Sequence, residues 1–249
     1  MAGRSLLGAL TVATALVLAG CLSVTGPLQD QGEDVLLMGE KHDDAAHHRA
    51  HAEVVRGLAA QGKLAALAIE MADRGATTAG LAPTADEQQV RSALRWSEDG
   101  WPWKAYAPAI MAAVGAGVPV LGANLPRTRM RPAMADTSLD AHLDDAARTA
   151  QQEAIRIGHC DLLPAQQLQP MVRVQVARDR EMADTIRVAA VPGKTVVLLA
   201  GSGHVDTKLG VPRHLPATLK VRAIVLERSA SAPAKDYCEE MHRHMQRRG

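Results

Sequence analysis

The sequence predicts an α/β fold: a mostly parallel β-sheet flanked by helices in a single domain. Short apolar runs alternate along the chain with longer segments whose apolar residues keep helical spacing, and this alternation is typical of parallel sheets. Glycine, proline or polar residues separate the two kinds of segment. Nothing with the composition of a linker interrupts residues 35–228, so we expect one domain over this range.

Five short apolar runs are the expected strands. Runs of this length between turn residues are consistent with strands that are buried on both faces of a parallel sheet. They cover residues 35–38, 64–69, 118–121, 195–199 and 221–226.

The expected helices lie between these strands. In residues 42–61 the apolar positions keep helical spacing, and Gly62 follows as a stop signal. Pro102 stands where a helix over residues 103–116 can begin. We also expect helices over residues 85–95, 144–157 and 168–190, irregular structure over 127–140, and a tail over 229–249 that is either a short helix or disordered at 236–248.

The N-terminal residues have the pattern of a signal peptide. Arg4 precedes an apolar stretch over residues 6–19, and its length of about 14 residues falls short of the ~20 that span a bilayer. The stretch ends in Leu-Ala-Gly-Cys, which resembles a bacterial lipobox, in which the cysteine is lipidated and becomes the new N-terminus. We therefore expect a signal peptide over residues 1–20, lipidation (palmitate among the acyl chains) at Cys21, and a lipidated tether over residues 21–34. An ordinary secretory signal with a chance cysteine is the alternative.

These features place the protein in the bacterial cell envelope, with lipid on Cys21 as its link to a membrane. Several acyl chains there would anchor it stably, since a single chain binds only marginally. Leu22, rather than an aspartate, follows the cysteine and favours the outer membrane of a Gram-negative cell. Without Arg4 the 28 basic residues become 27, which equals the 27 acidic ones. No basic surplus therefore indicates nucleic acid as a partner.

Two further cysteines, Cys160 and Cys238, lie far apart in the sequence. In an oxidising compartment they could form a disulfide that pins the C-terminal tail to the domain. They could also remain separate thiols, with Cys160 acting as a ligand beside His159.

A histidine stands three residues after a glycine at the end of two expected strands. Gly39 and His42 follow the first strand, and Gly201 and His204 follow the fourth. Glycine suits a sharp turn out of a strand and a close backbone approach to a ligand. Because ligands bind beyond the carboxyl ends of parallel strands, the repeat predicts a site at that edge.

Other strand ends add polar groups to the same edge. Glu40 and Glu70 close the first two strands, and Asn124 follows the third. Glu40, His42, Glu70 and His204 would suffice to hold a divalent metal ion with an open coordination position. The alternative is that the glycines are ordinary turns and the histidines are partly buried caps.

His47 and His51 lie one helical turn apart and could share a face of the first helix. Zinc ligation by this pair is possible. A solvated polar face is the expectation that we prefer.

Four of the five aromatic residues gather within eleven positions, at Trp96, Trp101, Trp103 and Tyr106, and Lys104 lies among them. Flat side chains with a phenol and a lysine could line a pocket for a flat hydrophobic ligand that carries carboxylates. A tyrosinate can also ligate haem iron axially. A hydrophobic plug under a loop is the alternative.

A set of motifs runs in order along nearly the whole mature chain, from about residue 35 to 228. Together with the lipobox they are Gly39-Glu40-x-His42 with His47-His48-Arg49, Ile69-Glu70-Met71, Gly100-Trp101-Pro102-Trp103 with Tyr106, Ala123-Asn124-Leu125-Pro126-Arg127, His159-Cys160, Arg178-Asp179-x-x-Met182-Ala183, Gly201-Ser202-Gly203-His204-Val205 and Gly210-Val211-Pro212-Arg213-His214-Leu215. These motifs resemble those of the ChaN-like haem-binding uptake family, within the Tiki/TraB-like superfamily.

The resemblance implies a surface lipoprotein with an α/β haem-binding domain over residues 35–228. It implies haem as the cofactor or cargo in iron acquisition, and a homodimer that can hold two haems face to face. Under this hypothesis Tyr106 is the first candidate for the axial ligand of the iron, with His204 and His42 behind it, and Trp101 and Trp103 line the haem. Lys104, Arg127 and Arg213 are candidates for propionate contacts, because a fixed cation offsets carboxylate charge.

The resemblance also implies a relationship to metalloproteases. The alternative function is therefore a metal-dependent hydrolase, a peptidase or esterase, in which Glu40, His42, Glu70 and His204 hold the ion or act as general base and the ion activates a water. Whether the chain is an enzyme stays open, and we prefer the interpretation that it is a binding protein.

Overall fold

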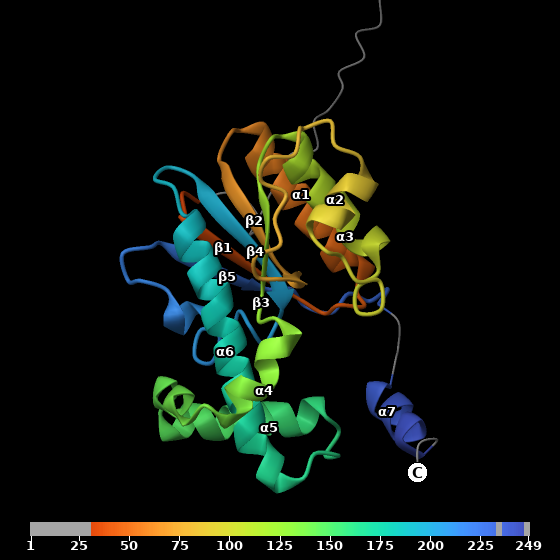
Figure 1. The fold of residues 1–249 in the computed structure, drawn as a ribbon, viewed down its shortest axis with the longest axis vertical. Coiled ribbons are helices and arrows are strands. Elements are labelled where there is room, and N and C mark those ends of the chain that lie inside the picture. The colour runs from red at the N-terminus through yellow and green to blue at the C-terminus, as the bar shows by residue number, and fades with distance from the viewer. Residues whose placement is uncertain (1–30, 233–235, 247–249) are drawn as a thin grey trace, which may run out of the picture.

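A five-stranded sheet forms the centre of the computed structural model, which describes residues 31–232 and 236–246. All pairings between these five strands are parallel, and the strand order is β3-β2-β4-β1-β5 (Figure 1). The α/β class and the parallel sheet predicted from the sequence are therefore confirmed. The strands are β1 (Val35–Glu40), β2 (Leu64–Asp73), β3 (Val120–Asn124), β4 (Thr195–Gly201) and β5 (Val221–Val225).

Helices cover both faces of this sheet. One face packs against α1 (Ala45–Ala60), α2 (Glu87–Ala93) and α3 (Trp103–Gly115), and the other packs against the long α6 (Ala165–Ala189) (Figure 1). The interfaces between the sheet and the helices on its two faces consist mainly of aliphatic side chains, and the strands are correspondingly apolar on both faces.

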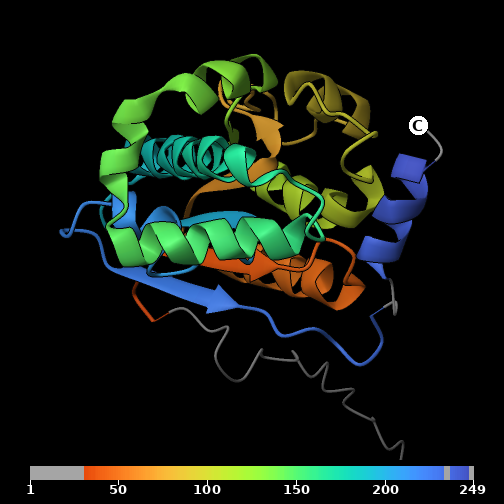
Figure 2. The same cartoon turned by 90° about the horizontal axis from the view of Figure 1, so that it is seen from below.

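A smaller cluster of helices packs on α6 at the end where the strands leave the sheet (Figure 2). It holds α4 (Arg127–Ala135), the 3-10 helix η1 (Thr137–His142) and α5 (Asp145–Gly158). The expectation of irregular structure over residues 127–140 is wrong. Pro132 lies inside α4, and Ala133 is its one fully buried residue, so the segment has no apolar stripe to indicate a helix.

The remaining elements follow β4 and β5. The 3-10 helix η2 (Val211–His214) lies between these strands, and α7 (Tyr237–Gln246) forms part of the tail. A disulfide joins Cys160, just after α5, to Cys238 in α7, across 78 positions of sequence. The pairing that we considered from the sequence is thereby confirmed.

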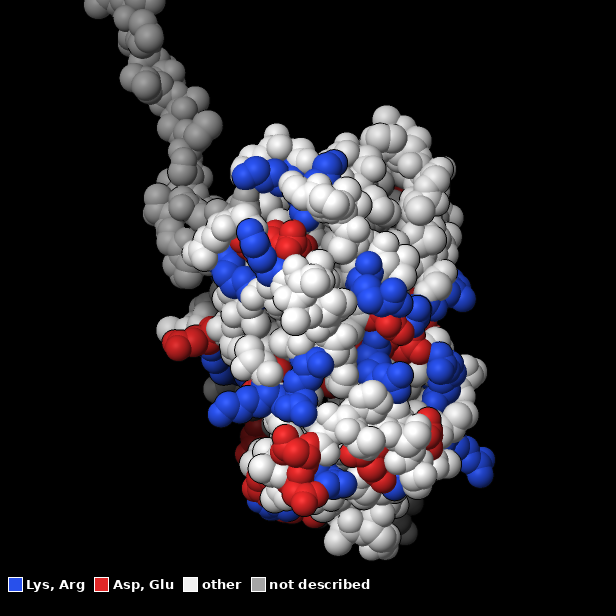
Figure 3. Space-filling view, turned by 90° about the vertical axis from the view of Figure 1, so that its left-hand side faces the viewer, with Lys and Arg blue, Asp and Glu red and all other residues white. Residues whose placement is uncertain are grey.

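Charged side chains of both signs are interspersed over the face of the molecule in Figure 3. This agrees with a sequence whose acidic and basic residues nearly balance. The expected signal peptide and Cys21 lie outside the described residues. Across the ranges that are described, none of the helices combines the length and apolar character needed to span a bilayer.

Candidate functional site

A pocket of about 700 Å³ opens at the edge where the parallel strands end. β4 lies between β1 and β2, so the turns after these three strands are neighbours in space although they are far apart in sequence. α5 and α6 form another wall, and the start of α7 reaches the rim. The two G-x-x-H turns, Glu40 and Glu70 all line this pocket, as the strand ends predict.

Glu40 fixes the orientation of His42 at one side of the pocket. Its Oε1 lies 2.6 Å from His42 Nδ1 and accepts a hydrogen bond of 2.7 Å from the Tyr106 hydroxyl. The His42 side chain is 39% exposed, and its Nε2 lies 4.0 Å from Glu70 Oε2. The Trp101 ring stacks edge-on against the imidazole, with ring centroids 4.7 Å apart.

Opposing effects act on the pKa of His42. Burial alone would lower it, but the hydrogen bond to Glu40 and the field of Glu70 raise the pKa above its ordinary value. The same contact holds the pKa of Glu40 below its ordinary value in spite of burial. The pair therefore favours an ionised carboxylate behind an imidazole whose Nδ1 carries the proton.

Glu70 and Asp179 clamp His204 on the other side of the pocket. His204 Nδ1 lies 2.6 Å from Asp179 Oδ1, and its Nε2 lies 3.5 Å from Glu70 Oε1. All three side chains are buried. Burial would lower the pKa of His204, but the two carboxylates raise it to about 10. The ring is therefore held as a cation that donates from both nitrogens.

Backbone and glycine complete the arrangement around Glu70. Its Oε2 accepts a hydrogen bond of 2.7 Å from the Gly201 amide. A Cβ at Gly201 would lie 2.9 Å from His42 Nε2 and 3.5 Å from Glu70 Oε2, so the glycine leaves room for both side chains. Arg178 lies 3.9 Å from Glu70 Oε1 and donates to Asn124 Oδ1 at 3.0 Å.

His47 is buried, which contradicts the expected solvated face of the first helix. Its Nδ1 accepts from the Lys41 amide at 2.9 Å, and its Nε2 donates to the Glu227 carbonyl at 2.8 Å. His47 therefore holds the turn after β1 against the segment after β5. Periodicity alone could not reveal this, because the partners lie outside the helix.

His51 is buried as well, at 1% exposure, beneath Glu40. Its Nδ1 lies 3.3 Å from Glu40 Oε2, yet neither ring nitrogen makes a well-formed hydrogen bond. Burial lowers the pKa of His51 to about 4 in spite of the nearby carboxylate. The ring is thus neutral at physiological pH.

The candidate haem residues are distributed unevenly around the pocket. His42 and His204 line it, whereas Trp101 does not line the pocket but packs against the His42 ring. Tyr106 is buried, with its hydroxyl on Glu40, and burial raises the pKa of its phenol. Trp103 is buried and donates through Nε1 to Glu87.

The three basic residues expected to contact propionates lie elsewhere. Lys104 and Arg127 are exposed near the starts of α3 and α4. Arg213 lies in η2, where it donates to the Lys208 carbonyl at 3.1 Å. The lysine and arginine residues that line the pocket are instead Lys41, Arg178 and Arg228.

We predicted no role for Asp179 from the sequence, although a signal was present. On α6 the residues that face the core follow a regular helical spacing, and Asp179 interrupts their apolar stripe. A carboxylate within such a stripe is rarely buried without a partner. The stripe is formed by Val172, Val176, Asp179, Ala183 and Ile186.

Four proposed metal ligands, Glu40, His42, Glu70 and His204, do meet at this edge. No group of three or more His, Cys, Asp or Glu side chains in residues 31–232 and 236–246 is arranged to hold a metal ion. Metal binding by these four residues therefore stays a prediction.

The protein is of the α/β class, and its parallel sheet carries carboxylate-backed histidines around an open pocket. Residues 29–215 match the family model described as haem-binding uptake, Tiki superfamily, ChaN. The chain belongs to this family, as its motifs predict.

Among solved structures, the chain is similar to ChaN of Campylobacter jejuni, whose structure is described as cofacial haem binding. The two share 26% sequence identity with a TM-score of 0.67, over 81% of this chain and 84% of that one. The structure of the type III effector HopBA1 matches more weakly, at 15% identity and a TM-score of 0.45, over 82% of each chain. No curated protein matches the sequence.

Proposed function

We propose that this protein binds haem in the pocket at the sheet edge, as a lipid-anchored envelope protein that takes part in haem or iron uptake. Membership of the haem-binding ChaN family supports the ligand. The single observation that carries the proposal for this chain is His42, an exposed imidazole backed by a buried carboxylate at the mouth of the pocket.

The donor set around His42 fits an iron porphyrin. A carboxylate on one ring nitrogen fixes the tautomer of a metal-binding histidine and leaves the other nitrogen for the metal. Glu40 occupies Nδ1, so Nε2 is the atom directed to the ligand. Haem would supply an iron that accepts this lone pair. Trp101, beside the imidazole, offers a flat apolar surface to a porphyrin.

Of the three candidate ligands, His42 is the best placed. Tyr106 would have to break its bond to Glu40, and His204 would have to leave Asp179 or lose a proton. We propose Lys41, Arg178 and Arg228 as propionate partners, since all three line the pocket and fixed cations favour carboxylates.

The test is a titration of residues 22–249 with hemin. We expect a stoichiometric Soret shift, and we expect His42→Ala to weaken binding by at least the roughly 10- to 100-fold that loss of a hydrogen-bond partner of a metal-bound histidine typically costs. His142→Ala, outside the pocket, should bind like the wild type. Tyr106→Phe discriminates the alternatives: it leaves the spectrum unchanged when His42 is the ligand and alters it when Tyr106 is.

Failure would have a clear signature. If hemin gives no specific Soret shift, and the protein copurifies with a transition metal that both His42→Ala and His204→Ala lose, the haem proposal fails. The metal-dependent hydrolase then becomes the proposed function. Size-exclusion chromatography with and without hemin tests the ligand-linked homodimer that cofacial binding in ChaN of Campylobacter jejuni suggests.

Lipid anchoring depends on Cys21 alone. We expect the full chain to fractionate with membranes, and Cys21→Ser to remain uncleaved or to lose its lipid, because acylation supplies the membrane affinity. Incorporation of labelled palmitate measures this directly. Equal labelling of the wild type and Cys21→Ser would refute the anchor.

A further inference from the structure

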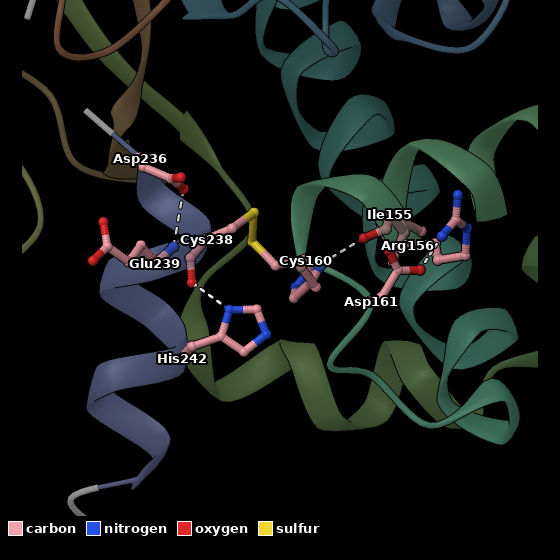
Figure 4. Close-up of a disulfide and its surroundings, with 9 residues drawn as sticks. Ile155, Arg156, Cys160, Asp161, Asp236, Cys238, Glu239 and His242 are labelled. Atoms are coloured by element: carbon pink, nitrogen blue, oxygen red, sulfur yellow. Dashed lines mark hydrogen bonds and ion pairs between the residues drawn. A yellow bond between two sulfur atoms is a disulfide. The ribbon is translucent and has the colours of Figure 1, made fainter. Parts of the chain in front are cut away.

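The C-terminal helix α7 contributes to the pocket although it lies outside the family match. The matched region ends at residue 215, whereas Tyr237 and Cys238 line the pocket together with Cys160. Figure 4 shows the disulfide between the start of α7 and the loop after α5. Family membership therefore does not account for this wall.

The loop that presents Cys160 has a defined backbone. Cys160 and Asp161 both adopt left-handed conformations, with φ of 57° and 59°, which cost non-glycine residues free energy. Arg156 forms an ion pair with Asp161 (Figure 4). His159 Nδ1 donates to the Ile155 carbonyl at 2.8 Å. These contacts direct Cys160 towards α7.

A second link joins the first turn of α7 to the rim. Tyr237 hydrogen-bonds to the Asp43 side chain, which also pairs with Arg228 at 2.8 Å. Asp43 belongs to the turn that carries His42, so α7 touches both walls of the pocket. Tyr237 itself remains 47% exposed, and Ile157 at the end of α5 is 59% exposed.

These two exposed apolar side chains flank the disulfide and line the pocket. Exposed large apolar side chains around a cavity are typical of a ligand-binding surface. A planar tetrapyrrole bound at His42 would cover apolar surface at this rim.

We infer that the Cys160–Cys238 disulfide holds α7 as a strap across the haem pocket, so that its reduction opens the pocket and speeds haem exchange. The inference rests on the proposed function for the identity of the ligand. A dithiol reductant supplies the two electrons: one thiolate attacks a cystine sulfur and forms a mixed disulfide, and the second thiolate resolves it. The protein gains two thiols and the reductant becomes a disulfide.

The experiment compares hemin release from the oxidised protein, the dithiol-reduced protein and Cys160→Ser/Cys238→Ser. Release is followed as transfer to an excess of apomyoglobin. We expect release to be roughly tenfold faster without the disulfide, which corresponds to one lost ligand contact of moderate strength. The double serine variant is needed because it cannot ligate iron through a new thiolate. Tyr237→Ala with the disulfide intact isolates the side-chain contact.

Limited trypsin digestion without hemin reports on α7 independently. Cleavage at Arg243 should be faster in the reduced protein and in the double variant, while circular dichroism shows the rest of the fold unchanged. Equal cleavage in all forms, or released α7 with unchanged hemin rates, would overturn the inference. Failure of every form to bind hemin would instead refute the proposed function, whether or not α7 is released.

Discussion

Replacing Glu70 with alanine is expected to lower the free energy of unfolding by about 3–5 kcal/mol, the range for breaking a buried ion pair from one side. Glu70 is buried and accepts the Gly201 amide. It also faces the cationic side chains of His204 and Arg178. Alanine would leave the amide without this acceptor and both cations without this counter-charge.

Urea denaturation monitored by circular dichroism measures the effect. Glu70→Gln keeps an acceptor for the Gly201 amide and should lose less stability. Glu53→Ala, at an exposed position of α1, is the control and should stay within ~0.5 kcal/mol of the wild type. If the free energy of unfolding of Glu70→Ala lies within about 1 kcal/mol of the wild-type value, Glu70 does not hold together the turns that follow β1, β2 and β4.

The wild-type protein should lose stability as pH falls from about 6.5 to about 4, with His51 as a principal cause. The pKa of His51 is about 4 in the folded chain, against an ordinary value of 6.5. Between these values the unfolded chain binds a proton that the folded chain excludes, so acid favours unfolding. The two pKa values correspond to about 3 kcal/mol. His204, with its pKa raised to about 10, acts oppositely: its contribution is complete below 6.5 and is lost as pH rises towards 10.

Unfolding free energies of the wild type and His51→Gln, measured by urea denaturation between pH 4 and 7, isolate the contribution of His51. The variant should have a shallower slope over this range. His242→Gln, at an exposed position of α7, should keep the wild-type slope. Parallel curves for the wild type and His51→Gln would show that a different group governs acid unfolding.

The sequence predicted the sheet well because burial on both faces forces the strands to be continuous apolar runs. It also predicted that Glu40, His42, Glu70 and His204 would meet, since parallel strands end at one edge. Strand order was not needed for that conclusion. Membership of the family followed from motifs spread over the same elements.

The sequence could not predict which polar groups would be buried against one another. Tyr106 belongs to an aromatic cluster that suggested a ligand surface, yet its hydroxyl is directed into the protein to reach Glu40. His47 and His51 looked solvated because their partners come from other elements. Lys104, Arg127 and Arg213 do not line this pocket for a related reason: a basic residue near a motif in the sequence can lie on another side of the fold.

The position of β4 between β1 and β2 has a consequence for how the protein matures. The first two strands cannot pair with each other directly, because a strand from the last quarter of the chain separates them. Such long-range pairing is slow to form. The two histidine turns become neighbours only when this late strand inserts, so a nascent or truncated chain that lacks residues 195–204 has no pocket in which to capture its ligand.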